Sequence, residues 1–207
     1  MTGDPLAGPL RPDLLAIAQR IRPRERVLDL GCGDGNLLRY LADTRDVSGR
    51  GVEISEAGVL ACVSKGLSVR QSDLHDGLDD YPSGSFDTVI LSQTLPYLND
   101  PLNVINDMLR IGQRAIVSFA NWGHWRCRLS LLVTGRSPLA PGLPQLWFEA
   151  PRARPLTISD FRVFCEDNGI AIISELDLVG PRTLRWRLAS NLRAEIVIFE
   201  LGRKHAS

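Results

Sequence analysis

Residues Val27–Gly35 read VLDLGCGDG, with glycine at every second position from Gly31 and an aspartate, Asp29, shortly before the first of them. Glycines at this spacing let a ligand approach the backbone, because no side chain stands in the way. Asp29 and Asp34 flank the loop and give it negative charge. A negatively charged loop favours a ligand that carries positive groups. The stretch therefore predicts a binding loop for a cationic small molecule.

The glycine spacing separates this loop from the dinucleotide-binding fingerprint. That fingerprint reads G-x-G-x-x-G, or ends in alanine. Counted from Gly31 and Gly33, its last position falls on Asn36, and a glycine stands one place earlier, at Gly35. A pyrophosphate would also lie at the following helix N-terminus, beside carboxylates that repel it. Register and charge both argue against NAD.

Two further acidic residues follow strand-like segments. Glu53, with Ile54 next to it, closes GRGVEI, and Asp73, with Leu74 as an apolar neighbour, lies in QSDL. An acid about 20 residues after a glycine loop also occurs in dinucleotide folds, so Glu53 alone does not identify the ligand. Aspartate is also frequent in turns, which gives Asp73 an alternative role.

Polar and aromatic residues follow the fourth and fifth strand-like segments. They are Ser92, Gln93, Thr94 and Tyr97 after one, and Asn121, Trp122, His124 and Trp125 after the other. Ser92 is a candidate cofactor contact. The weak catalytic candidates are His124, Gln93 and Tyr97, of which only the histidine titrates near neutral pH. The alternative for His124 is a structural role, hydrogen-bonded between two tryptophans.

These residues need a scaffold, and strand-like and helix-like segments alternate along most of the chain. Such alternation predicts an α/β fold in which a mostly parallel sheet has helices on both faces. The expected strands are 26–30, 49–54, 68–71, 86–92, 114–119, 171–178 and 194–201. The expected helices are 10–21, 36–42, 56–64, 101–110 and 159–168.

The sequence thus predicts a single domain over 1–207 with a seven-stranded sheet. Its last two strands have no helical room between them, so we expect them to form an antiparallel hairpin at one edge. Residues 1–24 form an N-terminal helix or cap. The alternation fails over 121–157, which we expect to be an irregular insertion or lid, because connections of this length are usually functional.

Composition excludes several kinds of partner. Lysine and arginine number 24, and so do aspartate and glutamate, so the basic surface that nucleic acids require is absent. The four cysteines form no C-x-x-C pair, which disfavours both disulfides and a metal site, and Cys32 is expected to be a packed side chain. No signal peptide or long apolar run is present. We expect a cytoplasmic protein that does not contact membranes.

The pattern D-x-G-x-G-x-G, here Asp29, Gly31, Gly33 and Gly35, resembles the first motif of class I S-adenosylmethionine-dependent methyltransferases. The resemblance implies a Rossmann-like fold and S-adenosylmethionine or S-adenosylhomocysteine as the cofactor. It implies that the loop, including Cys32, lies against the methionine part of the ligand. It also implies that Glu53 binds the ribose hydroxyls and that Asp73 contacts the adenine.

Three further stretches resemble the MetW family of methionine-biosynthesis proteins. They are FDTVILSQTL (86–95), MLRIGQRAIVSFANWGHWRCRL (108–129) and TISDF (157–161), and the NWGHW run is the most diagnostic. The resemblance implies association with a homoserine O-acyltransferase of the α/β-hydrolase type, whose activity the protein supports. It leaves open whether the chain forms homo- or hetero-oligomers and whether it catalyses a reaction of its own.

Two other functions compete with that hypothesis. One is an ordinary small-molecule methyltransferase, and the other is a scaffold that binds no nucleotide. A cluster of aromatic and arginine residues favours a docking surface, because this composition is typical of interface hot spots. The cluster comprises Trp122, Trp125, Trp147, Phe148, Arg126, Arg128, Arg152 and Arg154.

Overall fold

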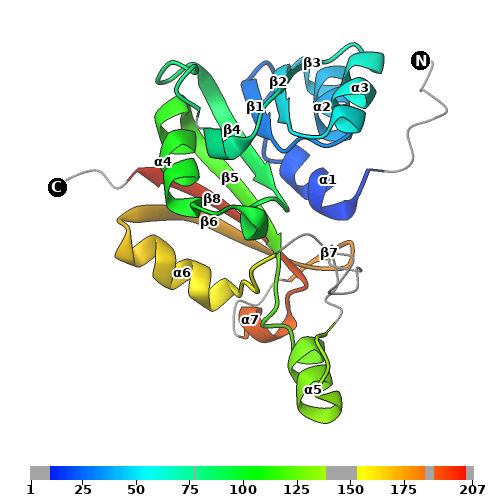
Figure 1. Cartoon of the computed structure of the whole chain (residues 1–207), viewed down its shortest axis with the longest axis vertical. Coiled ribbons are helices and arrows are strands. Elements are labelled where there is room, and N and C mark those ends of the chain that lie inside the picture. The colour runs from blue at the N-terminus through cyan, green and yellow to red at the C-terminus, as the bar shows by residue number, and fades with distance from the viewer. Residues whose placement is uncertain (1–9, 77, 139–152, 185–188, 204–207) are drawn as a thin grey trace.

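The computed structural model describes residues 10–76, 78–138, 153–184 and 189–203 (Figure 1). Its centre is an eight-stranded sheet in the order β3-β2-β1-β4-β5-β8-β6-β7. The strands are β1 (Arg26–Leu30), β2 (Ser48–Glu53), β3 (Ser68–Gln71), β4 (Phe86–Ser92), β5 (Gly112–Ala120), β6 (Ile170–Val179), β7 (Arg182–Thr183) and β8 (Ile196–Arg203).

The five helices that the sequence pattern predicts are present, within a few residues at each end, and the described residues contain two more. Together they are α1 (Pro12–Ala18), α2 (Asn36–Arg45), α3 (Glu56–Ser64), α4 (Pro101–Ile111), α5 (Trp125–Thr134), α6 (Ile158–Asp167) and α7 (Ser190–Arg193), with short 3-10 turns at Leu74–Asp76 and Leu95–Tyr97. Side-chain caps set three of the starts, because Ser55, Asp100 and Thr157 each accept a hydrogen bond from the backbone N–H three residues on.

Alternate residues of the central strands point to opposite faces of the sheet, and each face has its own core. Val27 and Ile90 pack with buried side chains of α1 and α2. Leu28 and Val89 pack with those of α4 and α6 on the other face. The predicted α/β architecture, with β1 to β5 parallel and helices on both faces, is therefore confirmed.

One detail of the predicted sheet differs, because the sheet has an eighth strand, β7, which is two residues long. The predicted antiparallel pair at one edge is confirmed, since β6 and β8 pair with each other there, and β8 lies between β5 and β6 and runs antiparallel to both. The four-residue helix α7 also occupies the connection expected to have no helix. Burial explains the order: β8 is largely buried, whereas β6 is half exposed along most of its length and takes a place near the edge.

The segment predicted as an insertion or lid contains α5, which projects from the end of the molecule remote from α3 (Figure 1). Residues 139–152, which carry the predicted Trp147, Phe148 and Arg152, lie outside the described residues. Within the described ranges no helix combines the length and apolar character needed to cross a membrane.

Candidate functional site

A cavity of about 420 Å³ lies at the carboxyl ends of β1 and β4. This is where ligands bind in open α/β sheets. Of the predicted residues, it brings together Asp29, Gly31, Cys32, Gly33, Ser92 and Gln93. Its other lining residues are Asp34, Asn36 and Leu37 from the loop and α2, and Leu10, Arg11 and Leu14 at the start of α1. We call this space the glycine-loop cavity.

The three loop glycines have different reasons to be glycine. All adopt positive φ angles, of 72°, 56° and 75° at Gly31, Gly33 and Gly35, a region that other residues disfavour. A Cβ on Gly31 would lie 2.6 Å from Thr94 Oγ1, and one on Gly35 would lie 2.5 Å from Leu67 Cδ1. A Cβ on Gly33 would meet nothing within 4 Å. Gly33 is therefore the position that leaves backbone open beside the cavity.

Asp29 is the most unusual charged group of the cavity. Its side chain is 3% exposed, and Oδ1 has no hydrogen-bond partner among the described residues. Burial first, and then the charge of Glu53, raise the pKa of Asp29 to about 7, while Arg11 opposes the shift. Asp34 differs, because it is more exposed and lies 3.7 Å from Lys65 Nζ. The group that still needs a positive partner is Asp29.

Glu53, at the end of β2, holds the glycine loop in place. Its Oε2 accepts a hydrogen bond of 2.8 Å from Gly33 N, and its Oε1 accepts one of 2.9 Å from Ser55 N. Gly58 in α3 packs against both groups, since a Cβ there would lie 2.8 Å from Glu53 Cγ and 2.9 Å from Gly33 O. Sequence reasoning missed Gly58, although a glycine inside a predicted helix signals close packing.

Asp73, Ile54 and Leu74 lie beside the loop without lining the cavity. Asp73 follows β3, and its Oδ1 accepts a hydrogen bond of 2.9 Å from His75 N and lies 2.7 Å from His75 Nδ1. These hydrogen bonds, the backbone one above all, lower the pKa of Asp73. Ile54 is 61% exposed, whereas Leu74 is buried in the core. The adenine-binding role of Asp73 stays a prediction, and the turn role is present in the structure.

Gln93 is strained and lies at the cavity. Its φ is 58°, an uncommon value for a residue other than glycine, and such strain concentrates at functional sites. Its backbone N–H donates to Ser118 O at 2.8 Å, while its buried Nε2 has no partner among the described residues. Tyr97, four residues further along the chain, does not line this cavity. Gln93 is the stronger of these two candidates for ligand contact.

The structure does not bring His124 to the glycine-loop cavity. It is the N-cap of α5, where its Nδ1 accepts a hydrogen bond of 3.3 Å from Arg126 N, and it lines a different cavity that shares no residue with the first. Burial lowers the pKa of His124, so the ring is neutral near pH 7. The structure therefore places the two catalytic candidates His124 and Gln93 at different cavities, and a catalytic role of His124 stays a prediction.

The sequence also missed the contribution of α1. Leu10, Arg11 and Leu14 line the cavity, and the Arg11 guanidinium is held 3.1 Å from the buried Asp13 carboxylate. The apolar spacing of this helix indicated only a face for the core, and nothing in it pointed to a ligand.

Cys32 lies in the cavity wall as a packed thiol, as expected. Its Sγ is 3.8 Å from Cys62 Sγ, and burial, the main cause, raises the pKa of Cys32. Such a thiol is a poor nucleophile. The described residues contain no cluster of three or more histidine, cysteine, aspartate or glutamate side chains arranged for a metal ion.

Comparison with known proteins places the chain in a family. The family described as "Methionine biosynthesis protein MetW" matches residues 11–201. The "Bifunctional methionine biosynthesis protein MetXA/MetW" of Rhodopirellula baltica is 33% identical over 195 residues, which cover 90% of this chain and 30% of that protein. The chain thus spans less than a third of the length of this relative.

Solved structures show the same fold. A S-adenosylmethionine-dependent methyltransferase from Mesorhizobium loti superposes with a TM-score of 0.67 at 19% identity, over 93% of this chain and 96% of that one. Magnesium protoporphyrin IX methyltransferase from Synechocystis, solved with S-adenosylhomocysteine bound, gives 0.60 at 22% identity, over 92% and 79%. With the glycine-loop motif, the family match and this fold together, the chain belongs to the MetW family of methionine biosynthesis proteins and is built on the methyltransferase fold.

Proposed function

We propose that this protein binds S-adenosylmethionine or S-adenosylhomocysteine in the glycine-loop cavity, and that it acts in methionine biosynthesis by associating with a homoserine O-acyltransferase. The observation that carries the ligand half is the buried Asp29 carboxylate, whose Oδ1 has no partner among the described residues beside an open stretch of loop backbone. The partner half is supported by the Rhodopirellula relative, whose name joins MetXA and MetW in one protein.

The chemistry of the cavity fits the amino-acid end of this ligand. The Asp29 carboxylate suits an α-ammonium group, which would supply the missing hydrogen-bond donor. Two donors, Gln93 Nε2 and the Arg11 guanidinium, suit the carboxylate of the ligand. S-adenosylmethionine would supply a methyl group on a sulfonium, and that second positive charge also favours a wall formed by Asp29.

The adenosine end would extend along the neighbouring strand ends. Glu53 already accepts two backbone N–H groups, but a carboxylate has about four lone-pair sites and retains capacity for ribose hydroxyls. Asp73 lies close to Glu53, because the backbone N–H of the adjacent Ser72 donates to Glu53 O at 3.1 Å. One extended ligand could therefore contact both acids.

A ligand can regulate the partner only if it binds the free and complexed forms with different affinity. The decisive experiment mixes the purified chain with the homoserine O-acyltransferase of the same organism and measures both complex formation and acyltransferase activity. Each is measured without ligand, with S-adenosylmethionine and with S-adenosylhomocysteine. We expect a complex, an activity above that of the acyltransferase alone, and an affinity that changes at least about fivefold with ligand.

The Asp29→Asn variant is the matched control. It should form the complex but lose the ligand effect, because it removes the charge that faces the ligand and leaves the outer surface intact. Equal affinity with and without saturating ligand would overturn the regulatory role. Transfer of a labelled methyl group to a metabolite, lost in Asp29→Asn, would instead establish the small-molecule methyltransferase. Absence of binding of either ligand would leave only the scaffold.

A further inference from the structure

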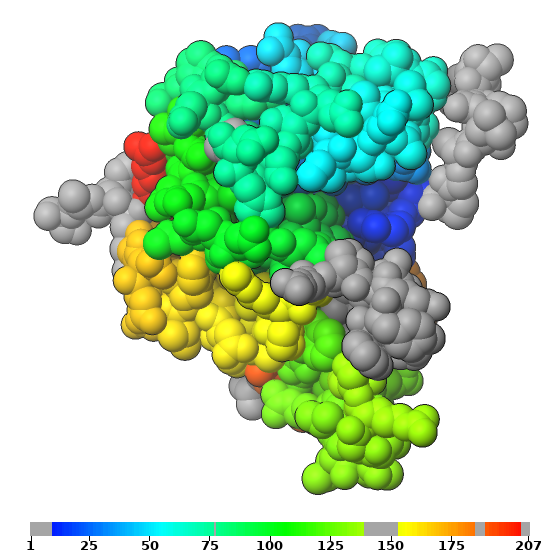
Figure 2. Space-filling view, viewed as in Figure 1, coloured from blue at the N-terminus to red at the C-terminus, as the bar shows by residue number. Residues whose placement is uncertain are grey.

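Helix α5 exposes a large amount of apolar surface. Leu132 is 84% exposed and Val133 71%, and Figure 2 shows the helix protruding at the lower end of the molecule. Trp125, Leu129 and Leu131 are exposed as well, and the buried residue of this helix is Cys127. Large exposed apolar patches mark sites of protein association. The glycine-loop cavity does not use this surface, since none of its lining residues comes from α5.

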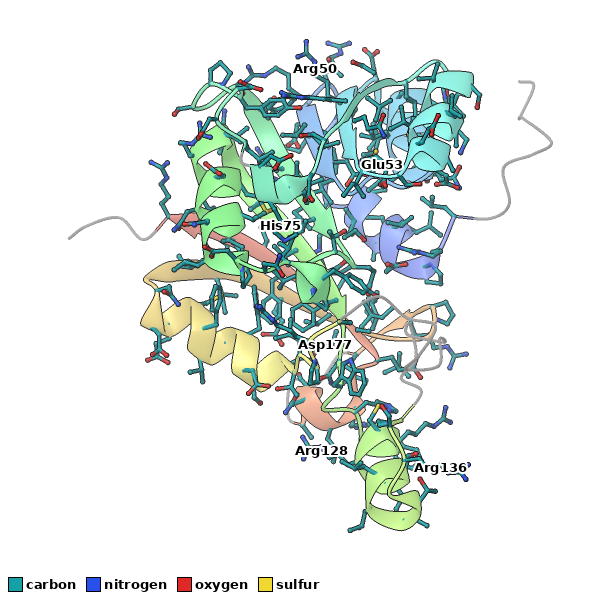
Figure 3. The ribbon with its side chains drawn as sticks, viewed as in Figure 1. Arg50, Glu53, His75, Arg128, Arg136 and Asp177 are labelled. Carbon is teal, nitrogen blue, oxygen red and sulfur yellow. The ribbon has the colours of Figure 1, made fainter. Side chains whose placement is uncertain are left out.

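The stretch of sequence that contains α5 carries charge of one sign. No aspartate or glutamate occurs from position 121 to 148. Arg126 and Arg128 lie on the helix and Arg136 just beyond it, and Figure 3 shows Arg128 and Arg136 on opposite sides of α5. Arg126 also lies over the Trp125 ring, with its Cζ 5.4 Å from the ring centre. The helix therefore offers apolar and cationic contacts together.

A second cavity, of about 430 Å³, lies at the base of α5 and extends this surface. Three arginines line it, Arg126, Arg182 and Arg193, and none of them forms an ion pair within the described part of the chain. Glu195 also lines the cavity, but its Oε2 accepts a hydrogen bond of 2.8 Å from Gly180 N. Because these guanidiniums have no anionic partner in the described chain, the cavity suits carboxylates from outside.

The arginine-lined cavity is continuous with α5, because His124 and Trp125 line the cavity and also form the N-cap and the first residue of the helix. Because His124 Nδ1 accepts the Arg126 N–H, its neutral ring carries the proton on Nε2 and offers another donor. We infer that α5 and the arginine-lined cavity form one docking surface for an acidic and partly apolar segment of the homoserine O-acyltransferase. This inference rests on the proposed function.

In this arrangement, carboxylate side chains of the partner enter the cavity and pair with Arg182 and Arg193. Apolar side chains of the same segment cover Leu129, Leu132 and Val133. A flat anionic membrane matches the surface less well, because individual carboxylates can enter a concave site that a plane of headgroups cannot. The association should therefore weaken at high ionic strength, as expected for charge-complementary interfaces.

The test measures affinity for the intact acyltransferase by calorimetry. Arg182→Glu, Arg193→Glu and Leu132→Asp should each weaken binding at least about tenfold, since they place a charge opposite a like charge or an apolar group. The matched controls are Arg50→Glu and Leu60→Asp, which make the same changes at exposed residues on β2 and α3 (Figure 3 labels Arg50, far from α5). The controls should bind as the unchanged chain does. Unaltered S-adenosylhomocysteine binding by all five variants shows that each is folded.

The outcomes separate this surface from the proposed function. If the unchanged chain binds the acyltransferase and the three test variants bind equally well, α5 and the arginine-lined cavity are not the docking surface, and the proposed function stands. If the unchanged chain does not bind with or without S-adenosylhomocysteine, the proposed function itself fails. Self-association abolished by Leu132→Asp, or vesicle binding abolished by Arg193→Glu while acyltransferase binding persists, would assign the surface to another occupant and overturn the inference.

Discussion

Asp29 has a pKa of about 7, so near neutral pH its side chain is divided between protonated and ionised forms. A cation beside it would favour the ionised form. Gly33 offers backbone at the same cavity, and Gln93 contributes a buried donor without a partner in the described chain. At the scale of residues, the site consists of groups whose hydrogen-bonding capacity is left for a ligand.

We predict that the free energy of unfolding falls as the pH rises from about 4 to about 7. In this window the folded protein keeps a proton on Asp29 that the unfolded chain releases, because the folded pKa is about 7 and the ordinary value is about 3.9. Asp29→Asn should remove this slope and stabilise the protein above pH 7, by up to about 4 kcal/mol. Urea unfolding across this range measures both effects.

Ligand binding should show the opposite trend with pH. S-adenosylhomocysteine should stabilise the unchanged protein more at about pH 8 than at about pH 6, because Asp29 pairs with the ligand ammonium in its ionised form. In Asp29→Asn the ligand should have little effect at either pH. A thermal shift equal in both proteins would refute the contact.

Gly33→Ala should reduce S-adenosylhomocysteine affinity at least about tenfold, since the new methyl group would stand beside the ligand. It should also cost about 1–2 kcal/mol of stability, because φ is 56°. Gly66→Ala is the control: its φ is 70° and its Cβ would also meet nothing within 4 Å, but it lies in the turn before β3, away from the cavity. It should lose the same stability and bind normally, as calorimetry and urea unfolding can check.

The sequence was informative for residues whose role depends on local context. The loop glycines and Asp29 were found because register and charge of a contiguous loop suffice to predict a ligand approach. Arg11 and Gly58 were not found, because their roles depend on which element packs over the loop. The separation of His124 from Gln93 could not be predicted, because the sequence does not show in which direction the chain turns after a strand.

At the scale of elements, hydrogen bonds at the end of β5 connect this strand with α6, with α7 and with the segment before α5. The fully buried Asn121 donates from Nδ2 to Asn191 O and Ala194 O, both at 2.9 Å, and its Oδ1 accepts from Gly123 N and Ile158 N. Gly123 lies so close that a Cβ would be 2.3 Å from Asn191 Oδ1. Asn121 and Gly123 of the NWGHW run are thus explained by contacts with the starts of α6 and α7 and with the segment before α5.

Asn121→Asp should lower the free energy of unfolding by about 2–4 kcal/mol, because it replaces two buried donors with an acceptor that faces carbonyl oxygens. Asn106→Asp, the same change at an exposed position of α4, should have an effect of less than about 0.5 kcal/mol. Urea unfolding compares them. A small loss at Asn121 would mean that the connection between these segments does not depend on this side chain.

The sequence predicted the positions of helices and strands along the chain better than the order of the strands in the sheet. Periodicity located the helices and strands, since each depends on residues close in the chain. It could not predict that β8 would insert between β5 and β6, because strand order is decided by contacts between segments far apart in sequence. A strand as apolar as IVIFEL was nevertheless a signal for an interior position.

At the scale of the whole molecule, Arg114 connects the two ends of the described chain. This β5 side chain lies 2.9 Å from Glu200 in β8 and 3.1 Å from Glu25 before β1, and it also donates to Arg20 O at 2.8 Å. The three charged side chains are 10–16% exposed. The network therefore couples the N-terminal segment, the sheet interior and the C-terminal strand.

Arg114→Met should destabilise the protein by up to about 3–5 kcal/mol, because two largely buried carboxylates lose their nearest cation and keep only more distant ones, Arg20 at 3.5 Å from Glu200 and Arg22 at 4.0 Å from Glu25. Arg26→Met removes the more exposed pair with Asp87, 2.9 Å apart, and should cost about 1 kcal/mol or less. Urea unfolding at low and high salt should show that the stability lost in Arg114→Met changes little with salt concentration. Equal losses in the two variants would contradict a special role for the network.

The place of β8 has a consequence for folding during synthesis. When residues up to 195 have left the ribosome, β5 and β6 already exist in sequence, but the strand that pairs with both of them does not. Until residues 196–203 arrive, both strands have open backbone edges, and β5 carries a run of buried apolar residues. Open apolar edges are where nascent chains aggregate, so the time between these two points is when a chaperone would protect this protein most.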